Sequence, residues 1–356
     1  MLFIVGALLL FLLALDLMIS SLQHLGRGAA ETILLATSNP FTGLFIGLLI
    51  TAMLQSSSTT TALVVAFVAS GAMSLQNAIP VIMGANIGTT ITAMIVSLGF
   101  INRKKEFKRA VAAGSFHVFF NMLTAIILFP LEYNYGVLSS LSQDVAQYFF
   151  TPPAQPAGPG MHPWYGFDLL DDLFLRIPSA PFFVAAFALV FLFVSILMFR
   201  KLISDLLKAK SPEAFSRFFF RSPWKSFGWG LLTTAAIRSS TITTSVVVPI
   251  VAKRIASLKQ AAPFIMGANV GTTITAFIAA AIQGNTVSAL SIAIAHFLFN
   301  FIGVVLFLPL PLVREIPLYL SNGLGKITLK YRLAGFLFLV LTFFFIPFTL
   351  IYFNQD

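Results

Sequence analysis

The chain has 356 residues, of which 58% are hydrophobic and only 10% are charged, and its mean hydropathy is +0.93. A soluble domain carries about 25% charged residues, so this composition excludes an ordinary soluble protein and predicts an integral membrane protein. A net charge of +10 suggests nucleic acid in a soluble chain, but in a hydrophobic chain it indicates basic cytoplasmic loops and no nucleic-acid partner. The absence of cysteine excludes disulfides, thiolate metal sites and thiol catalysis.

Long apolar runs along the chain predict membrane-spanning helices. We expect the first run to be a retained helix, because it lacks a basic leading region and a small-residue cleavage site. The runs lie at about 1–19, 78–100, 110–130, 181–199, 261–282, 286–309 and 333–353.

Two further apolar stretches, 41–73 and 227–252, are each interrupted in the middle by a hydroxyl-rich cluster. The first cluster reads QSSSTTT from Gln55, and the second reads RSSTITT from Arg238. Each half is too short to cross a bilayer alone. The two stretches therefore predict helical hairpins that dip into the membrane and return, with their irregular backbone buried in protein or lining a cavity.

The basic residues predict the orientation of the chain. Of the 22, 19 lie in 101–109, 200–225, 251–260 and 310–332, and cytoplasmic loops are the segments enriched in Lys and Arg. This places the N-terminus in the cytoplasm and the C-terminus outside, with the first hairpin entering from outside and the second from inside. The connection 131–178, with its Pro/Gly-rich middle, is then an extracytoplasmic linker.

An internal repeat relates the two halves. Gly47–Ala93 overlies Gly230–Ala276 without gaps, with 28 identities in 47 positions. The shared core reads IMGANIGTTITA in one copy and IMGANVGTTITA in the other, and HVFFN from His117 echoes HFLFN from His296. Three predicted crossings separate corresponding positions, so the copies have opposite orientation in the membrane.

The predicted fold class is an all-α polytopic membrane protein with two inverted-topology repeats, each containing a re-entrant helical hairpin and a broken transmembrane helix. Repeat 1 covers 1–130 and repeat 2 covers 179–309, with the linker 131–178 between them. A cytoplasmic loop and a final transmembrane helix make up 310–356. Inverted repeats with interrupted apolar segments are typical of secondary transporters that bind their substrate near the midplane.

The chemistry of the interruptions favours ion binding. Hydroxyl and carbonyl oxygens are ligands for hard cations such as sodium, while backbone N–H groups at the start of a returning half-helix favour an anion. Ser and Thr in a membrane helix can instead bond a carbonyl one turn back, and the glycines of GANxGTT can serve helix packing alone. The duplication of both clusters favours an ion site.

Arg238 is the counterpart of Gln55 and lies at membrane depth, where a charge costs about 2.5–3.5 kcal/mol on insertion scales. It can bind an oxyanion bidentately, pair with Asp16, or occupy one cation position. No His, Asp or Glu lies at a spacing typical of catalysis or of a metal centre, so we predict no enzyme, no catalytic residue and no cofactor. We expect His117 and His296 to hydrogen-bond within the bundle.

The tandem QSSS and GANxGTT arrangement, present in both halves, resembles the type II sodium/phosphate cotransporter family. The match is to a bacterial-like short form, expected to lack the soluble regulatory domain of many bacterial relatives. The family usually has Gln in the second signature as well, so Arg238 departs from it. The resemblance implies sodium-driven import of inorganic phosphate across the inner (plasma) membrane, by a rocking or elevator-like alternating-access cycle.

The resemblance implies ion-binding roles for the two signatures, 55–58 and 238–241. From their polar oxygens, we expect the GANxGTT segments to be unwound at the midplane, to face the hairpin tips and to complete the ion sites. We expect phosphate to be bound by Ser56, Ser57, Arg238, Ser239, Ser240, Asn86 and Asn269. We expect the transported sodium ions to be bound by Gln55, Ser58, Thr59, Thr89, Thr90, Thr241, Thr243, Thr272 and Thr273. Possible supporting residues are Asn121, Asn300 and Asp16. The alternatives are a transporter of another oxyanion such as sulfate, a carboxylate transporter, an ion channel and, most remotely, an intramembrane serine hydrolase.

Overall fold

The structure is a computed structural model that describes Leu17, 39–149, scattered residues between 182 and 194, 219–220, 222–282 and 286–354. The predicted first helix, Asp16, most of the 181–199 helix and most of the 200–225 basic segment lie outside these residues. The described part folds into helices without strands. Five helical segments are long and apolar enough to cross a membrane, as expected for a multi-pass membrane protein. They are Leu75–Leu98, Lys104–Tyr135, Leu258–Ala281, Val287–Phe307 and Ala334–Phe353.

Hairpin 1 consists of α3 (Pro40–Leu54) and α4 (Ser57–Ala69). Its first arm begins where Pro40 occupies the first turn and the Asn39 side chain caps Phe41 N, the position that tolerates proline. Hairpin 2 consists of α12 (Pro223–Ile237) and α13 (Ser240–Ala252), with Ser222 and Pro223 in the equivalent roles. Arms of 13 to 15 residues measure about 20–22 Å, less than the ~30 Å hydrocarbon core.

Each hairpin leads into an interrupted crossing. In repeat 1 this is α5 (Leu75–Gly88) followed by α6 (Ile91–Leu98), and in repeat 2 it is α14 (Leu258–Gly271) followed by α15 (Ile274–Ile282). The interruption is a tightened turn rather than an unwound stretch. Thr89 and Thr90 keep right-handed helical dihedrals, and Thr90 N donates to Ile87 O three residues back.

Glycines allow the first arm of each hairpin to lie against the interrupted crossing. A Cβ atom on Gly84 would overlap the Leu44 carbonyl oxygen, and one on Gly267 would overlap the Phe227 carbonyl oxygen. Small residues at such crossings let helix backbones approach closely in membranes. The G-x-x-x-G pattern therefore packs α3 on α5 and α12 on α14.

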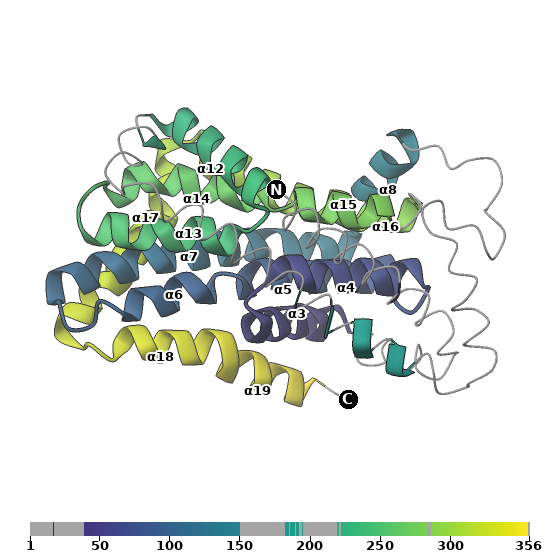
Figure 1. The fold of residues 1–356 in the computed structure, drawn as a ribbon, viewed down its shortest axis with the longest axis horizontal. Coiled ribbons are helices and arrows are strands. Elements are labelled where there is room, and N and C mark those ends of the chain that lie inside the picture. The colour runs from purple at the N-terminus through teal and green to yellow at the C-terminus, as the bar shows by residue number, and fades with distance from the viewer. Residues whose placement is uncertain are drawn as a thin grey trace.

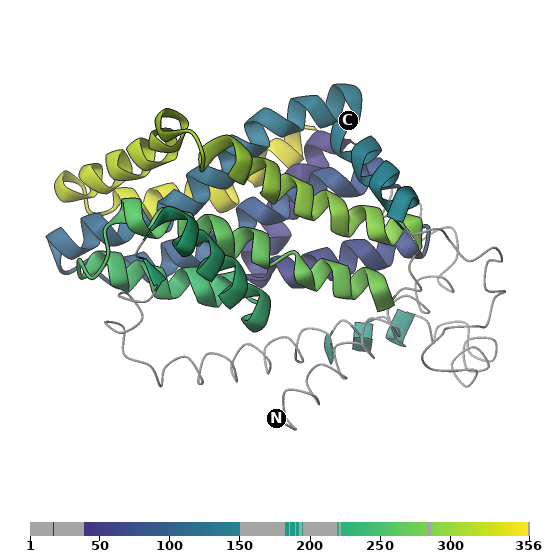
Figure 2. The same cartoon turned by 90° about the horizontal axis from the view of Figure 1, so that it is seen from above.

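One long helix completes the described part of each repeat. Repeat 1 continues with α7 (Lys104–Tyr135), and repeat 2 continues with α16 (Val287–Phe307). The return arm of each hairpin packs on the long helix of the other repeat, α4 on α16 and α13 on α7. Figures 1 and 2 show hairpin 2 toward one end of the molecule and hairpin 1 toward the other, with their tips near the middle.

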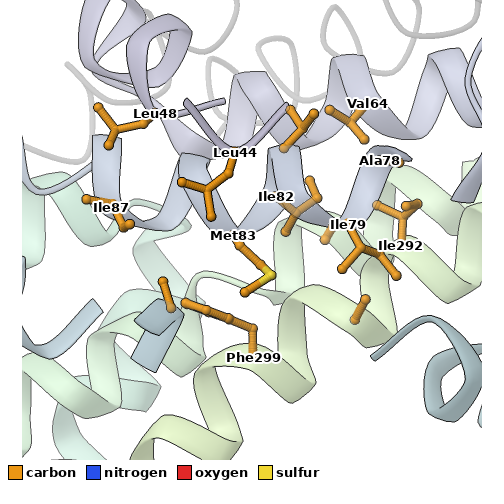
Figure 3. Close-up of a cluster of buried hydrophobic side chains, with 14 of the residues drawn as sticks. Leu44, Leu48, Val64, Ala78, Ile79, Ile82, Met83, Ile87, Ile292 and Phe299 are labelled. Atoms are coloured by element: carbon orange, nitrogen blue, oxygen red, sulfur yellow. The ribbon is translucent and has the colours of Figure 1, made fainter. Parts of the chain in front are cut away.

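The apolar core surrounds the interrupted crossings. In Figure 3, Ile79, Ile82 and Met83 of α5 lie between hairpin 1, represented by Leu44 and Leu48, and Phe299 of α16. Phe264 and Met266 of α14 are buried in the corresponding cluster of repeat 2. Both interrupted crossings are thus enclosed by protein, where interrupted helical hydrogen bonding is tolerated.

Two segments expected to be connections contain helices. Within the predicted linker, α8 (Val137–Phe149) begins where the Glu132 carboxylate accepts from Leu138 N at 2.6 Å and Ser139 N at 3.1 Å. Within the predicted loop 310–332, α17 (Pro311–Lys330) packs on α7 through Gly325, close to the Lys108 carbonyl. The chain ends with α18 (Ala334–Val340), the π-helical turn η1 (Leu341–Phe345) and α19 (Ile346–Phe353), at the periphery of the bundle in Figure 1.

Candidate functional site

The two hairpin tips share an uncommon backbone geometry. Gln55 has φ 53° and ψ 29°, and Arg238 has φ 58° and ψ 28°. Both are left-handed, a conformation that costs a residue with a side chain roughly 1–2 kcal/mol. Such strain concentrates at functional sites. The left-handed residue ends the first arm of each hairpin at the position where the hydroxyl cluster begins.

A serine directly after each tip caps the return arm. Ser56 Oγ accepts from Thr59 N at 3.3 Å and from Thr59 Oγ1 at 2.9 Å. In hairpin 2, Ser239 Oγ accepts from Ile242 N at 3.4 Å. The first backbone N–H groups of α4 and α13 therefore lie at the tips, and a helix N-terminus carries a partial positive charge.

Hydrogen bonds bring the two tips together. Thr241 Oγ1 donates to Gln55 O at 3.4 Å and lies 3.4 Å from Thr89 Oγ1, at the interruption of repeat 1. Thr272 Oγ1, at the interruption of repeat 2, donates to Ser240 Oγ at 3.2 Å. Both hairpin tips and both interrupted crossings therefore form a single, largely buried polar region, which we call the tip site.

Two threonines of the tip site are absent from the predicted residues. Thr92 Oγ1 donates to Gln55 Oε1 at 3.5 Å, and Thr275 Oγ1 donates to Ser58 Oγ at 3.3 Å. They occupy the same place in the two copies of GTTIT. The duplication of that third hydroxyl could have identified them from sequence.

Four asparagines and two histidines form a second polar region, the central network, in which each histidine bonds an asparagine of the other repeat. His117 Nε2 lies 3.0 Å from Asn269 Oδ1, and His296 Nε2 lies 3.1 Å from Asn86 Oδ1. Asn121 and Asn300 complete the network, since Asn269 Nδ2 donates to the Oδ1 atoms of both, at 2.6 and 2.7 Å. All six side chains are buried.

Backbone carbonyls determine the orientation of these amides. Asn86 Nδ2 donates to Ile82 O, and Asn300 Nδ2 donates to His296 O. Asn300 Oδ1 therefore faces Asn269 Nδ2, which leaves Asn269 Oδ1 facing His117. An amide oxygen only accepts, so the proton of each histidine lies on Nε2, and in the neutral ring Nδ1 is an acceptor.

Most of the predicted residues thus fall into two groups. The tip site contains Gln55, Ser56, Ser58, Thr59, Thr89, Arg238, Ser239, Ser240, Thr241 and Thr272. Ser57 is buried at the start of α4. Asn86, Asn269, Asn121 and Asn300 lie in the central network, where their amides bond protein groups.

Three other predicted ligands donate their hydroxyl groups to backbone carbonyls three or four residues earlier in the chain. Thr90 Oγ1 donates to Ile87 O, Thr273 Oγ1 to Val270 O and Thr243 Oγ1 to Ser239 O. Asp16 lies outside the described residues. The histidines hydrogen-bond within the bundle, as expected.

The tip site offers hydroxyl and carbonyl oxygens to a cation and two helix N-termini to an anion. Among the residues that the structure describes, no group of three or more His, Asp or Glu side chains is placed to hold a metal ion. The chemistry of the site therefore suits hard, oxygen-preferring ions.

Comparisons with known proteins agree with this chemistry. A family model described as Na+/Pi-cotransporter matches residues 10–137 and 190–344, which is most of the chain. Sodium-dependent phosphate transport protein 2A of Rattus norvegicus is 29% identical over 96% of the chain and 66% of its own length. Sodium-dependent phosphate transport protein 2B of Homo sapiens is 28% identical over 97% of the chain and 64% of its own length. The chain thus spans slightly less than two thirds of these relatives. No solved structure matches it significantly.

Proposed function

Because the chain belongs to the Na+/Pi-cotransporter family, we propose that it is a symporter that imports inorganic phosphate together with sodium by alternating access. The relatives it resembles are named sodium-dependent phosphate transport proteins. The substrates would be phosphate and sodium, both transported and neither retained as a cofactor.

The observation that carries the proposal is the meeting of the hairpin tips, where Thr241 Oγ1 donates to Gln55 O. Two capped helix N-termini, at Ser56 and Ser239, approach the same region. Their partial positive charges favour a phosphate, while the surrounding hydroxyl and carbonyl oxygens suit sodium. One region can hold both ions, which is what coupled transport requires.

Coupling follows from the cost of burying charge. Phosphate taken from water into a site enclosed by protein loses hydration, and nearby cations must offset that loss. Sodium ions at the tip-site oxygens would provide the positive charge. Arg238 would provide one further positive charge at the tip of hairpin 2, in place of one sodium ion.

We also propose the membrane orientation that the basic residues indicate, with the N-terminus in the cytoplasm and the C-terminus outside the inner (plasma) membrane. Hairpin 1 then enters from outside and hairpin 2 from the cytoplasm. The short hairpin arms support re-entry rather than crossing. Two inverted repeats that meet at the midplane can expose one site alternately to the two sides.

The test is uptake of radiolabelled phosphate by the purified protein in liposomes with an inward sodium gradient. We expect accumulation that requires sodium, is not supported by lithium or potassium, and is resistant to excess sulfate. Strong competition by sulfate or a carboxylate would identify a different substrate. Uptake that does not depend on the sodium gradient would refute the proposal of a symporter.

A further inference from the structure

Equivalent threonines in the two hairpins make different hydrogen bonds. The gap-free superposition of the repeats pairs Thr51 with Thr234, Thr60 with Thr243 and Thr61 with Thr244. All six are buried. Because the residue types are identical in each pair, a difference in bonding reflects the placement of each hairpin and not the identity of these threonines.

The first difference concerns the two arms of each hairpin. In hairpin 1, Thr51 Oγ1 donates to Thr60 Oγ1 at 2.8 Å and joins the arms. In hairpin 2, Thr243 Oγ1 donates to Ser239 O of its own arm at 3.0 Å, as Thr60 Oγ1 also does to Ser56 O at 3.3 Å. The buried Thr234 Oγ1 has no hydrogen-bond partner among the described residues. Hairpin 2 therefore lacks the bridge between its arms.

The second difference concerns the central network. Thr61 Oγ1 lies 3.5 Å from His296 Nδ1, the acceptor nitrogen of that ring, so hairpin 1 is bonded to the network. The equivalent acceptor, His117 Nδ1, is buried and unpartnered within the part of the chain that the structure describes. Thr244 Oγ1 instead donates to Ser240 O, one turn back in its own helix, at 2.8 Å.

An unpartnered buried acceptor is costly and is rare in native structures. Here the sequence supplies its partner, because Thr244 and His117 repeat the pair formed by Thr61 and His296. Thr244 lies on α13, which packs on α7, the helix that carries His117, so a shift of hairpin 2 along α7 is the movement that the missing bond requires. Hairpin 1 shows that the same residues can adopt the bonded arrangement.

We infer that these two Thr–His pairs are positioning contacts that alternate during transport. Thr61–His296 holds hairpin 1 in the conformation described here, and Thr244–His117 holds hairpin 2 in the opposite conformation. The inference rests on the proposed alternating-access function, because exchanging the arrangements of two inverted repeats converts one facing state into the other. The central network is the common support against which each hairpin engages in turn.

The experiment measures the ratio of the two conformations in variants that remove one hydroxyl without changing side-chain shape. The chain has no cysteine, so spin labels on introduced cysteines report without background. Ser70, at the end of hairpin 1, and Tyr135, at the exposed end of α7, are suitable positions. The wild-type protein in liposomes, with sodium and phosphate, supplies the reference distance distribution.

Thr61→Val is expected to lower the population of the conformation described here, and Thr244→Val to raise it. A hydrogen bond of ordinary strength changes the ratio roughly 2- to 10-fold. The double variant should return toward the wild-type ratio. Thr124→Val serves as the matched control, because Thr124 Oγ1 donates to Phe120 O in its own helix, and it should leave the ratio unchanged.

Opposite shifts support the inference, since a merely structural role would not reverse sign between equivalent residues. Shifts in the same direction, or an unchanged distribution in both variants, overturn it. If a valine variant does not fold, His296→Gln and His117→Gln remove the other partner of each pair and should give the same opposite shifts. Opposite shifts without sodium-driven phosphate uptake would refute the proposed function alone, whereas normal uptake without opposite shifts would refute this inference alone.

Discussion

Hairpin 1 and hairpin 2 turn with nearly the same backbone angles but carry different side chains at the turn. Gln55 and Arg238 differ by 5° in φ, at 53° and 58°, yet one is neutral and the other charged. The helices behind the tips are nearly identical, with GANIGTT and GANVGTT at the same crossings. Helix packing therefore constrains both repeats equally, and the tips are where the two repeats differ.

The largest expected effect tests the shared packing. Gly84→Ala and Gly267→Ala each place a methyl group against a backbone carbonyl of the facing helix, which cannot rotate away. We expect each to destabilise the protein by about 1–3 kcal/mol or more. The measurement is the thermal unfolding temperature in detergent. Gly228→Ala is the control, since a Cβ there meets nothing within 4 Å.

If Gly84→Ala and Gly267→Ala lowered the unfolding temperature by very different amounts, the equivalence of the two crossings would be contradicted. Equal decreases in the unfolding temperature of both variants, with no decrease in Gly228→Ala, would show that the two repeats pack their helices in the same way.

The next effect tests the tip serines. Ser57→Ala and Ser240→Ala each remove one hydroxyl at the start of a return arm, where the ions are proposed to bind. A hydrogen bond to a charged group contributes about 1.5–3 kcal/mol, so we expect phosphate uptake at subsaturating substrate to fall more than tenfold. Size-exclusion chromatography of each variant checks that the protein remains folded.

Ser321→Ala is the control for the serine variants, because Ser321 Oγ bonds Pro317 O within α17, outside the tip site. Normal uptake by both tip variants would remove Ser57 and Ser240 from the proposed site. A loss in only one of them would mean that the hairpins contribute unequally to binding.

The tips themselves are tested by exchanging their side chains. Arg238→Gln gives both hairpins the same neutral tip and removes one fixed positive charge, so we expect uptake to need a higher sodium concentration and to rise more steeply with it. Gln55→Arg should change sodium activation in the opposite direction. The measurement is the sodium dependence of uptake in liposomes. Unchanged sodium activation in Arg238→Gln would contradict the proposal that the arginine replaces a sodium ion.

Sequence reasoning located the hairpins and the interruptions because these features are local. The apolar runs and hydroxyl clusters placed the tips at Gln55 and Arg238, where the structure has them. It missed α17, because the charges of 310–332 resemble those of a loop. That segment nevertheless forms a helix that packs on α7.

The central network could not be derived from local patterns. Its bonds join residues far apart in the chain, such as Asn86 and Asn300, and the repeat indicated only that the same residue types recur. Which nitrogen of each histidine faces an asparagine depends on how the two repeats are placed against each other. The sequence therefore predicted that the histidines hydrogen-bond, but not their partners.

The smallest expected effect concerns the bases of the hairpins, where the repeats also differ. Arg109 Nε donates to Ala252 O at 2.7 Å, at the end of α13, and Ser288 lies at the equivalent place in repeat 2, eight residues before its histidine. A cation at a helix C-terminus stabilises it by about 0.3–1 kcal/mol. Arg109→Gln should therefore loosen only the exit turn of hairpin 2.

Hydrogen–deuterium exchange measures this loosening directly. In Arg109→Gln, exchange should become up to about fivefold faster at 253–257 and stay unchanged at 70–74, the exit turn of hairpin 1. Ser288→Ala should change neither turn. Faster exchange at both turns in Arg109→Gln would mean that the guanidinium supports the whole bundle. If the faster exchange were confined to 253–257, hairpin 2 would be held at its base by a contact that hairpin 1 does not have. The two hairpins need not then move with equal ease.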